Sequence, residues 1–271
     1  MKSYAIYDEQ LNRKAAIGYL FYYEKAQQFI IELCRDLDEW DAPILFQKFV
    51  KERIYTIPRD VSFLWVKERV IPSGRQNIGT ILKNHKLKNY SEMALLQLSK
   101  GKCSQDDCYI ESVTESEIPE EIRNRTMENL SECFPTTDGR IVCMFRDNTV
   151  RKIELSKLEN KYKDVSYILH NDNLRNSAKV GVGGYSVVFN ESIEIEVNDL
   201  RRVGELLPLT ADDFKGYIHR TVVDTTKACE MLGCSRQNLA YLVKEGKITP
   251  IINGSKENLY ARCDVERLIK E

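Results

Sequence analysis

Two short amphipathic stretches near the carboxyl end, separated by residues 233–235, constrain the fold of this chain more than any other feature. The first, over 225–232, places its apolar side chains on one helical face: Ala228, Met231 and Leu232. Gly233 then permits the positive φ with which a helix ends in a sharp turn. The second begins after Ser235, a good N-cap residue, and its apolar side is Leu239, Leu242 and Val243. We expect Thr225 or Thr226 to cap the first helix and Gly246 to close the second, which makes the pair a helix-turn-helix.

The residues after this pair predict a β-wing and a last helix. Ile248–Ile252 and Leu259-Tyr260 are expected to be brief strands around the turn Asn253-Gly254-Ser255, and Asp264 is expected to open the last helix. This order over 219–271 resembles the MerR- and excisionase-type winged helix-turn-helix DNA-binding domain. The motifs that carry the resemblance are the helix end at Ala228–Gly233, Ser235-Arg236 and Gly246-Lys247-Ile248. Family wings often carry consecutive arginines, whereas the tip here is Gly254-Ser255-Lys256-Glu257.

The packing of the second helix implies which residues would meet DNA. If its apolar side faces the core, Arg236, Gln237 and Asn238 face outward on the turn that enters a major groove. Arg236 suits guanine O6 and N7, and Gln237 or Asn238 suits adenine N6 and N7. The expected contacts to the DNA backbone are Ser235, Tyr241, Lys244, Lys247 and Lys256.

Charge is balanced over the whole chain, with 40 Lys and Arg against 41 Asp and Glu, but not along it. Residues 48–102 hold twelve bases and four acids, a net charge of +8, whereas residues 106–138 hold ten acids and two bases, a net charge of −8. This switch indicates a domain edge or an acidic strap over a basic face; the alternative is two solvated surfaces without a special partner. Within the basic stretch, Arg75, Lys83, Lys86 and Lys88 form a candidate surface for an anion or a partner. The loop 74–77 is either an anion site or a structural turn.

The rest of the chain predicts an α+β multidomain protein. We expect a basic, mixed helical N-terminal domain (1–112), a small antiparallel α+β domain of paired hairpins (119–209) and the C-terminal winged helix-turn-helix (219–271). In the first domain, 17–23 is a buried strand or the start of a helix, and 25–37 shows helical spacing of Phe29, Ile30, Leu33 and Leu37. Helices are predicted over 44–50, 77–82 and 90–98, the last capped by Ser91.

The middle stretch predicts two hairpins, one over 140–155 around Asp147-Asn148 and one over 185–197. A short helix from Asn198 to Val203 is expected to follow, with Gly204 as its stop. The stretch resembles a small prokaryotic paired-hairpin domain of unknown function on these residues: Phe145, Asp147, Ile153, Leu155, Phe189, Ile195 and Leu200. Members are often encoded beside toxin-like partners, so the resemblance implies an antitoxin or adaptor role and no catalytic residues.

Chemical motifs beyond DNA contact are scarce. The eight cysteines include two C-x4-C pairs, Cys103/Cys108 and Cys229/Cys234, but the histidines (His85, His170 and His219) lie near neither pair. We interpret the cysteines as free thiols, with a metal site as the alternative, and the glycines at 181–184 as a turn between strands rather than a phosphate loop. We therefore expect no enzyme activity, no metal and no cofactor. No apolar run is long enough to span a bilayer and no secretory signal is visible, which favours a cytoplasmic protein.

These features predict a sequence-specific, DNA-binding transcriptional regulator, an autorepressing antitoxin-like protein of a prokaryotic operon. Its expected partners are double-stranded DNA, a second copy in a homodimer and a toxin-like protein. Residues 221–271 hold eight bases and seven acids, so a single module binds weakly and needs dimerisation or help from the basic stretch. The alternative is a protein-interaction adaptor that neutralises a toxin without binding DNA. A nucleic-acid enzyme would need acidic metal ligands that the basic stretch does not offer.

Overall fold

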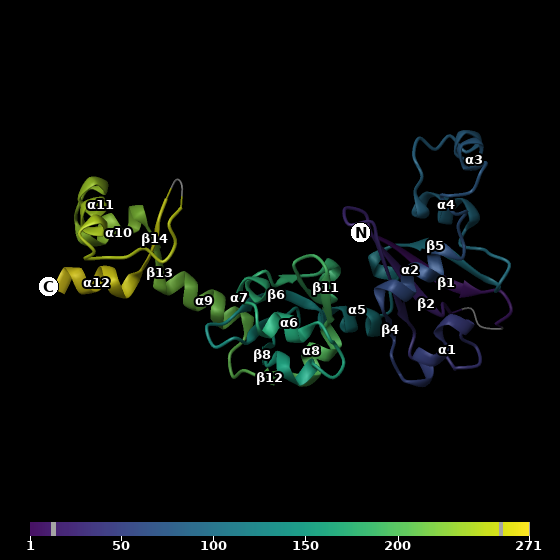
Figure 1. Cartoon of the computed structure of the whole chain (residues 1–271), viewed down its shortest axis with the longest axis horizontal. Helices are drawn as coiled ribbons and strands as arrows, with labels where there is room; N and C mark the ends of the chain where they lie inside the picture. Colours follow the sequence, from purple (N-terminus) through teal and green to yellow (C-terminus); the bar gives the residue numbers. More distant parts are fainter. Residues whose placement is uncertain (12–14, 255–256, 271) are drawn as a thin grey trace. The chain divides into compact units, whose positions relative to one another are not determined.

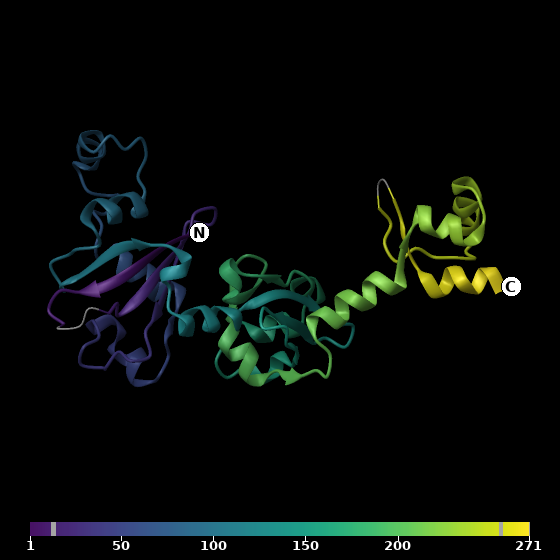
Figure 2. The same cartoon turned by 180° about the vertical axis from the view of Figure 1, so that it is seen from behind.

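The computed structural model describes residues 1–11, 15–254 and 257–270, and it confirms the mixed α+β class (Figures 1 and 2). These residues form twelve α-helices and fourteen β-strands. The chain divides into two compact units, one of Met1–Leu130 with Val180–Val188 and one of Ser131–Lys179 with Phe189–Glu271. The predicted middle stretch, 119–209, therefore contributes residues to both units. None of the described helices combines the length and the apolar character needed to cross a bilayer.

A five-stranded antiparallel sheet forms the centre of the first unit. In spatial order its strands are β4 (Thr56–Ile57), β3 (Gln28–Leu33), β2 (Gly18–Tyr23), β1 (Lys2–Asp8) and β5 (Cys108–Val113). One face packs against α1 (Ile44–Lys51), α2 (Arg59–Lys67) and α4 (Glu92–Ser99) through a core that includes Phe46, Trp65 and Leu96. The other face packs around Phe21 and Ile122, which belongs to α5 (Glu120–Met127) and follows the 3-10 turn η1 (Glu115–Glu117). Apolar side chains therefore fill both faces of the sheet.

The covered second face explains an error in the sequence prediction. Residues 25–37 were expected to be helical, but 28–33 form the strand β3, and each residue from Phe29 to Leu33 is buried. Phe29, Ile31 and Leu33 belong to the core on the α1–α2 face. A strand buried on both faces has no polar alternation, so an apolar run of this kind imitates a helical stripe. Of residues 17–23, for which the sequence allows a strand or the start of a helix, 18–23 form the strand β2.

The helical segments of this unit agree better with the sequence. The helix expected over 44–50 is α1, and those expected over 77–82 and 90–98 are α3 (Ile78–Asn84) and α4. Ser91 caps α4 as expected, because its hydroxyl accepts a hydrogen bond from the Ala94 N–H at 3.3 Å.

One ion pair is buried inside the unit. Glu32 on β3 is fully buried and accepts hydrogen bonds from Arg125 Nη1 at 3.0 Å and from the Thr56 hydroxyl at 2.9 Å. Arg125 on α5 also donates to the Leu33 carbonyl at 2.9 Å. Burial raises the pKa of the Glu32 carboxyl to about 7, although the charge of Arg125 opposes the rise. The pair ties α5 to the sheet.

The middle stretch forms two small sheets. The first has the order β12 (Glu205–Leu206), β8 (Val150–Ile153), β7 (Ile141–Phe145), β6 (Leu130–Pro135). The predicted hairpin is its β7–β8 pair, which is antiparallel and turns at Asn148 with φ 68°. The second sheet has the order β11 (Ile193–Glu196), β10 (Ser186–Phe189), β9 (Lys179–Val180), and the predicted second hairpin supplies its first two strands. The glycines at 181–184 form the turn between β9 and β10, within which lies the 3-10 turn η3 (Val182–Gly184).

Short helices complete this region. They are η2 (Leu155–Leu158), α6 (Val165–Leu169), α7 (Asp172–Asn176) and α8 (Val197–Val203). The helix expected from Asn198 is α8, which begins one residue earlier and ends at Gly204. Next comes α9 (Ala211–Thr221), for which the sequence carried no prediction; it starts with a capping box between Thr210 and Asp213.

Residues 222–270, which we call the C-terminal module, contain β13 (Val222–Asp224), α10 (Thr225–Leu232), α11 (Arg236–Lys244), β14 (Leu259–Ala261) and α12 (Arg262–Lys270). The expected first wing strand, 248–252, is reduced to one bridge between Ile252 and Leu259. Instead, β14 pairs along its length with β13, antiparallel. The last helix begins at Arg262, ahead of the expected Asp264.

Candidate nucleic-acid interface

A small apolar core holds the C-terminal module together and orients its helices. Each helix and the strand β14 contribute to it, and its buried side chains are Ala228, Leu239, Ile248, Tyr260 and Val265. Leu242 and Val243 pack partly against the same core, as the sequence predicted. Because these residues lie on one side of α11, the opposite side of that helix is left to solvent.

The cap of α10 differs from the prediction. Asp224 is the N-cap residue, and its carboxylate accepts a hydrogen bond from the Lys227 N–H at 2.7 Å. Thr225 and Thr226, the expected caps, are used elsewhere. The Thr225 hydroxyl donates to the Asn258 carbonyl and accepts from the Asn258 N–H, both at 3.2 Å. These bonds tie α10 to the segment between α11 and β14, whose described residues 248–254 and 257–258 we call the wing. Tertiary partners thus compete with the local cap for these hydroxyls.

The turn between α10 and α11 matches the prediction. Gly233 ends α10 in the left-handed region at φ 62°. Ser235 caps α11, because its hydroxyl accepts a hydrogen bond from the Asn238 N–H at 3.2 Å. After α11, Gly246 takes φ 71° and turns the chain toward Ile248. The turn therefore fixes where the first residues of α11 point.

The side chains predicted to contact DNA bases lie together on the exposed face of α11. Arg236, Gln237 and Asn238 are all exposed and occupy its first turn. Two residues of α11 were predicted to contact the DNA backbone. Tyr241 is 55% exposed, and Lys244, which is also exposed, lies one helical turn after Tyr241. Lys247 is exposed just beyond the helix, and neither lysine makes an ion pair within the described part of the chain. Lys256, the predicted wing-tip contact, lies outside the described residues.

The hydroxyl of Thr226, which the sequence predicts as a possible N-cap of α10, instead holds Arg236 in place. Its Nη2 donates to Thr226 Oγ1 at 2.7 Å, and the Thr226 hydroxyl lies 3.5 Å from Glu257 Oε1. A guanidinium group has five N–H donors, so the bond to Thr226 leaves donors available. The arrangement orients the guanidinium group at the start of α11. A threonine in the first turn of the preceding helix is the sequence signal that indicates this contact.

A cleft of about 330 Å³ separates α11 from the wing. Arg236, Ala240 and Val243 line it from α11, and Gly254, Glu257 and Asn258 line it from the wing. Its walls are partly apolar, and Glu257 places a carboxylate beside Arg236. The described residues of the cleft therefore contribute its shape and one ion of each sign, Arg236 and Glu257.

The predicted basic surface of the first unit lies apart from its core. Arg75, Lys83, Lys86 and Lys88 are all exposed, and they fall before, within and after α3. The acidic stretch does not cover them: its Asp106 pairs with the buried Arg69. The exposure of these four residues argues against an acidic strap over them and agrees with the solvated-surface alternative.

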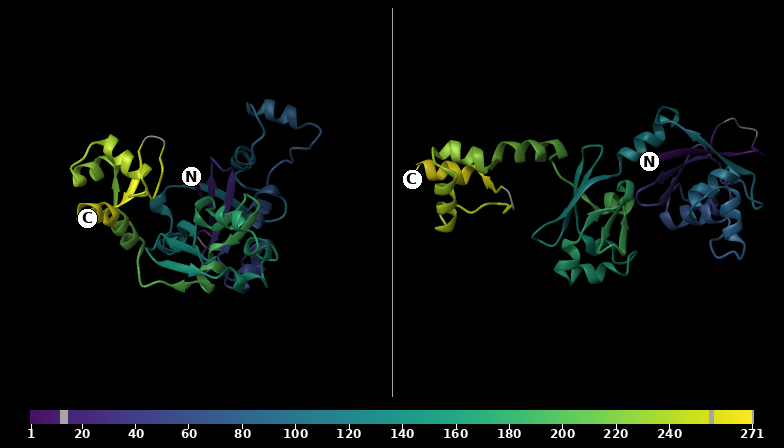
Figure 3. Two further views of the ribbon diagram at one scale, coloured as in Figure 1. Left: turned by 60° about the vertical axis from the view of Figure 1, so that its left-hand side comes forward. Right: turned by 90° about the horizontal axis from the view of Figure 1, so that it is seen from above.

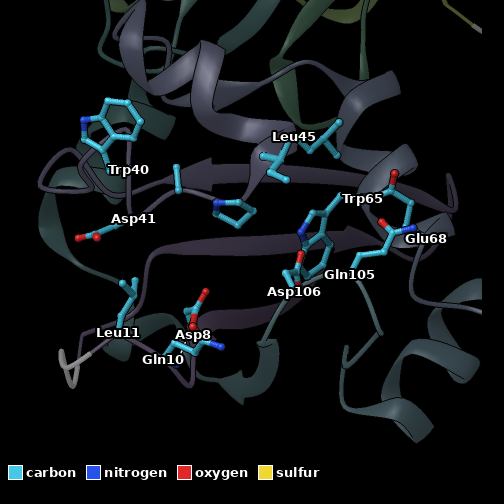
Figure 4. Close-up of a pocket in the computed structure, with 13 residues that line it drawn as sticks. Asp8, Gln10, Leu11, Trp40, Asp41, Leu45, Trp65, Glu68, Gln105 and Asp106 are labelled. Carbon is cyan, nitrogen blue, oxygen red and sulfur yellow. Dashed lines mark hydrogen bonds between the residues drawn. The ribbon is translucent and has the colours of Figure 1, made fainter.

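A second concavity, of about 390 Å³, lies on the first unit (Figure 4). Figure 4 shows Trp40 and Asp41 on one side of it and Trp65 and Asp106 on the other. Trp40 is 82% exposed, whereas Trp65 is fully buried and its indole N–H has no hydrogen-bond partner among the described residues. The described lining residues offer carboxylates and indole rings, and none of them is a histidine, cysteine or serine.

All eight cysteines are free thiols, and three of the buried ones, Cys108, Cys133 and Cys143, are poor candidates for chemistry. Burial raises the pKa of the Cys133 thiol to about 12 and holds the pKa values of Cys108 and Cys143 well above their usual range. These thiols therefore stay protonated at neutral pH. No group of three or more His, Cys, Asp or Glu side chains suited to a metal ion occurs among the described residues.

Comparisons with known proteins add no assignment, so the function is argued from the geometry of the site. No protein-family model, curated protein or solved structure matches this chain.

Proposed function

We propose that this protein is a sequence-specific, DNA-binding transcriptional regulator whose C-terminal module is a winged helix-turn-helix. One arrangement carries the proposal: the polar first turn of α11 is exposed, while Leu239 on its opposite side is 1% exposed and anchors it. A helix held in this way offers its N-terminal residues to base edges when it enters a major groove. Arg236, Gln237 and Asn238 are the side chains that would read sequence.

Each polar group on α11 has a chemical role in this proposal. Arg236, oriented by Thr226, would donate two hydrogen bonds to guanine O6 and N7. The Ser235 hydroxyl accepts from Asn238 as a cap and still has its proton to donate to a phosphate. Lys244 and Lys247 would pair with phosphates further along, which sets register rather than sequence.

A single module has too little charge for tight binding. Its residues, 222–270, hold eight bases and six acids, and a net charge of +2 supports only weak affinity, on the order of micromolar. We therefore expect two copies of the chain to bind two half-sites related by dyad symmetry. If the protein represses its own synthesis, as an antitoxin-like regulator would, its operator lies in the DNA upstream of its gene. That DNA is the first duplex to test.

The test is selection of binding sites from random duplex DNA with the full chain, followed by fluorescence anisotropy on the selected site. We expect Arg236→Ala to weaken binding to that site by about 5- to 150-fold, which corresponds to about 1–3 kcal/mol, and to relax base preference at one position. Lys244→Gln should weaken binding to all duplexes alike, because it removes a charged partner of the DNA phosphates.

The matched control is Arg262→Ala. Arg262 is an arginine of the same module, but it lies on α12 and pairs with Glu266 at 3.0 Å. The substitution Arg262→Ala changes the net charge by the same amount as Arg236→Ala and leaves the exposed face of α11 intact. If Arg236→Ala selects the same sequence with the same affinity as the wild type, the assigned readout is wrong.

A protein-binding role for the same module is the second candidate. The observation that favours it is the exposure of two wing isoleucines, Ile251 at 57% and Ile252 at 55%. Isoleucines at this position would suit an apolar partner surface, such as a toxin-like protein. In that case the full chain would bind no duplex at low salt, and Ile251→Ser would release a copurified partner while Arg236→Ala would not.

A further inference from the structure

The segment from Ile71 to Tyr90, which we call the basic insertion, leaves the first unit between α2 and α4. It contains α3, and none of its residues is buried. In Figures 1 and 2 and on the left of Figure 3, α3 stands clear of the sheet and of α4. At its base the Tyr90 hydroxyl donates to the Ile71 carbonyl at 2.9 Å and joins the two ends. The insertion is therefore closed at its base and contributes nothing to the core.

Its charge is of one sign and is not neutralised. Arg75, Lys83, Lys86 and Lys88 are exposed, and no Asp or Glu occurs between Glu68 and Glu92. None of these four basic side chains makes an ion pair or a side-chain hydrogen bond with any residue that the structure describes. Other bases of the same unit are paired, for example Arg69 with Asp106 and Lys102 with Glu9. The insertion thus carries four unpaired positive charges and no acid within one short segment, whereas the other unpaired basic residues of the unit are spread over its surface.

The other side chains of the insertion indicate which anion it suits. No large apolar side chain within it is exposed, so it has no anchor for a lipid surface. Its only tyrosine, Tyr90, is half-buried and engaged at the base, and it has no Phe or Trp, so the exposed imidazole of His85 is the single ring on which a base of a single strand could stack. The other exposed polar side chains of the insertion are amides and two hydroxyls, which hydrogen-bond phosphate and sugar oxygens: Ser73, Gln76, Asn77, Thr80, Asn84 and Asn89. Phosphates of a duplex fit this set best.

We propose that the basic insertion is a second, sequence-independent contact of this protein with the phosphates of duplex DNA. The proposal rests on the proposed function only in naming duplex DNA as the ligand. The insertion would supply the phosphate contacts that the nearly neutral C-terminal module lacks. Each such contact releases condensed cations from DNA, so it makes binding more dependent on salt.

The test compares the full chain with the variant Arg75→Gln, Lys83→Gln, Lys86→Gln, Lys88→Gln on a random-sequence duplex, by anisotropy over a range of KCl concentrations. The slope of log Kobs against log[K⁺] should become shallower by about 0.9 for each phosphate that the variant no longer neutralises, or by about 2 to 4 in all. Thermal unfolding should be unchanged, because no core residue is touched. A control variant, Lys25→Gln, Lys51→Gln, Arg53→Gln, Lys100→Gln, removes the same charge from other exposed, unpaired positions of the unit.

The outcomes separate this proposal from the proposed function. An unchanged slope, or an equal change in the control variant, overturns the insertion as a DNA-binding surface even if Arg236 reads sequence. A shallower slope in the insertion variant alone supports it, even if no preferred sequence emerges from selection. Stronger loss of binding to poly-glutamate than to the duplex would overturn it in favour of an acidic protein partner.

Discussion

Removing the charge of Arg125 tests whether the ion pair inside the first unit has the electrostatics that its geometry implies. Arg125→Met keeps much of the side-chain volume but removes the group that lies 3.0 Å from the fully buried Glu32. Glu32 then keeps the Thr56 hydroxyl at 2.9 Å and the neighbouring Tyr185 side chain, neither of which carries a positive charge. A buried carboxylate without a counter-charge costs about 3–5 kcal/mol of unfolding free energy. We expect a loss of that size at pH 8.

The loss should shrink in acid. The pKa of Glu32 is raised to about 7 in the folded protein, so that state holds a proton which the unfolded chain releases near pH 4.5. Stability from this proton is complete below about pH 4.5 and is lost as the pH rises through 7, a change of about 3 kcal/mol in the wild type. Without Arg125 the pKa rises further, because the charge that opposes the rise is gone. At pH 5 Glu32 is then neutral in the variant, and the loss should fall to about 1–2 kcal/mol, the value of the hydrogen bonds removed.

Urea unfolding followed by tryptophan fluorescence measures this effect in the right part of the molecule. Both tryptophans, Trp40 and Trp65, belong to the first unit, so the signal reports its unfolding. The double variant Arg125→Met, Glu32→Gln is the control, and it should recover most of the loss at pH 8 while showing little dependence on pH. Equal destabilisation by Arg125→Met at pH 5 and pH 8 would refute the reasoning, because it would mean that the ionisation of Glu32 is not involved.

Three further substitutions probe the fold. Gly184→Ala should lower the free energy of unfolding of the first unit in urea by about 2 kcal/mol or more. Gly184 has φ 76°, and a Cβ there would lie 2.3 Å from the Leu130 carbonyl oxygen. An unchanged urea midpoint would contradict this close approach. Ser235→Ala should cost the C-terminal module about 1 kcal/mol through removal of the cap, seen as faster amide exchange at Asn238, whereas Ser235→Asp should restore protection. Leu239→Ala should cost about 2–5 kcal/mol in amide-exchange stability of α11, and a loss below about 1 kcal/mol would show that this residue is not its anchor.

Local signals were read correctly where the interactions that decide them span only a few residues. Ser91 and Ser235 cap the helices that they precede, and Gly233 takes the positive φ that ends α10. Asn148 turns the hairpin of β7 and β8 in the left-handed region, which asparagine tolerates. In each case donor and acceptor, or the strained residue itself, lie within one turn of the chain.

The failures involve partners that are distant in sequence. Residues 28–33 became a strand because β2 and β4 flank them and side chains cover both faces. Thr225 and Thr226 do not cap α10 because Asn258 and Arg236 use their hydroxyls. Glu32 went unnoticed, although a lone acid in the apolar run from Phe29 to Leu33 was a signal, since its partner Arg125 is 93 residues away.

The sequence by itself determined the α+β class, the two helices and the tight turn of the C-terminal module, and which side of α11 is apolar. It did so because periodicity, caps and turn residues act over short distances along the chain. Three features became visible only in the folded chain. Thr226 orients Arg236, and β14 pairs with β13 rather than with a full wing strand. The basic insertion stands free of the core. These features depend on contacts between residues that are far apart in the sequence, and local sequence patterns do not show which distant residues come into contact.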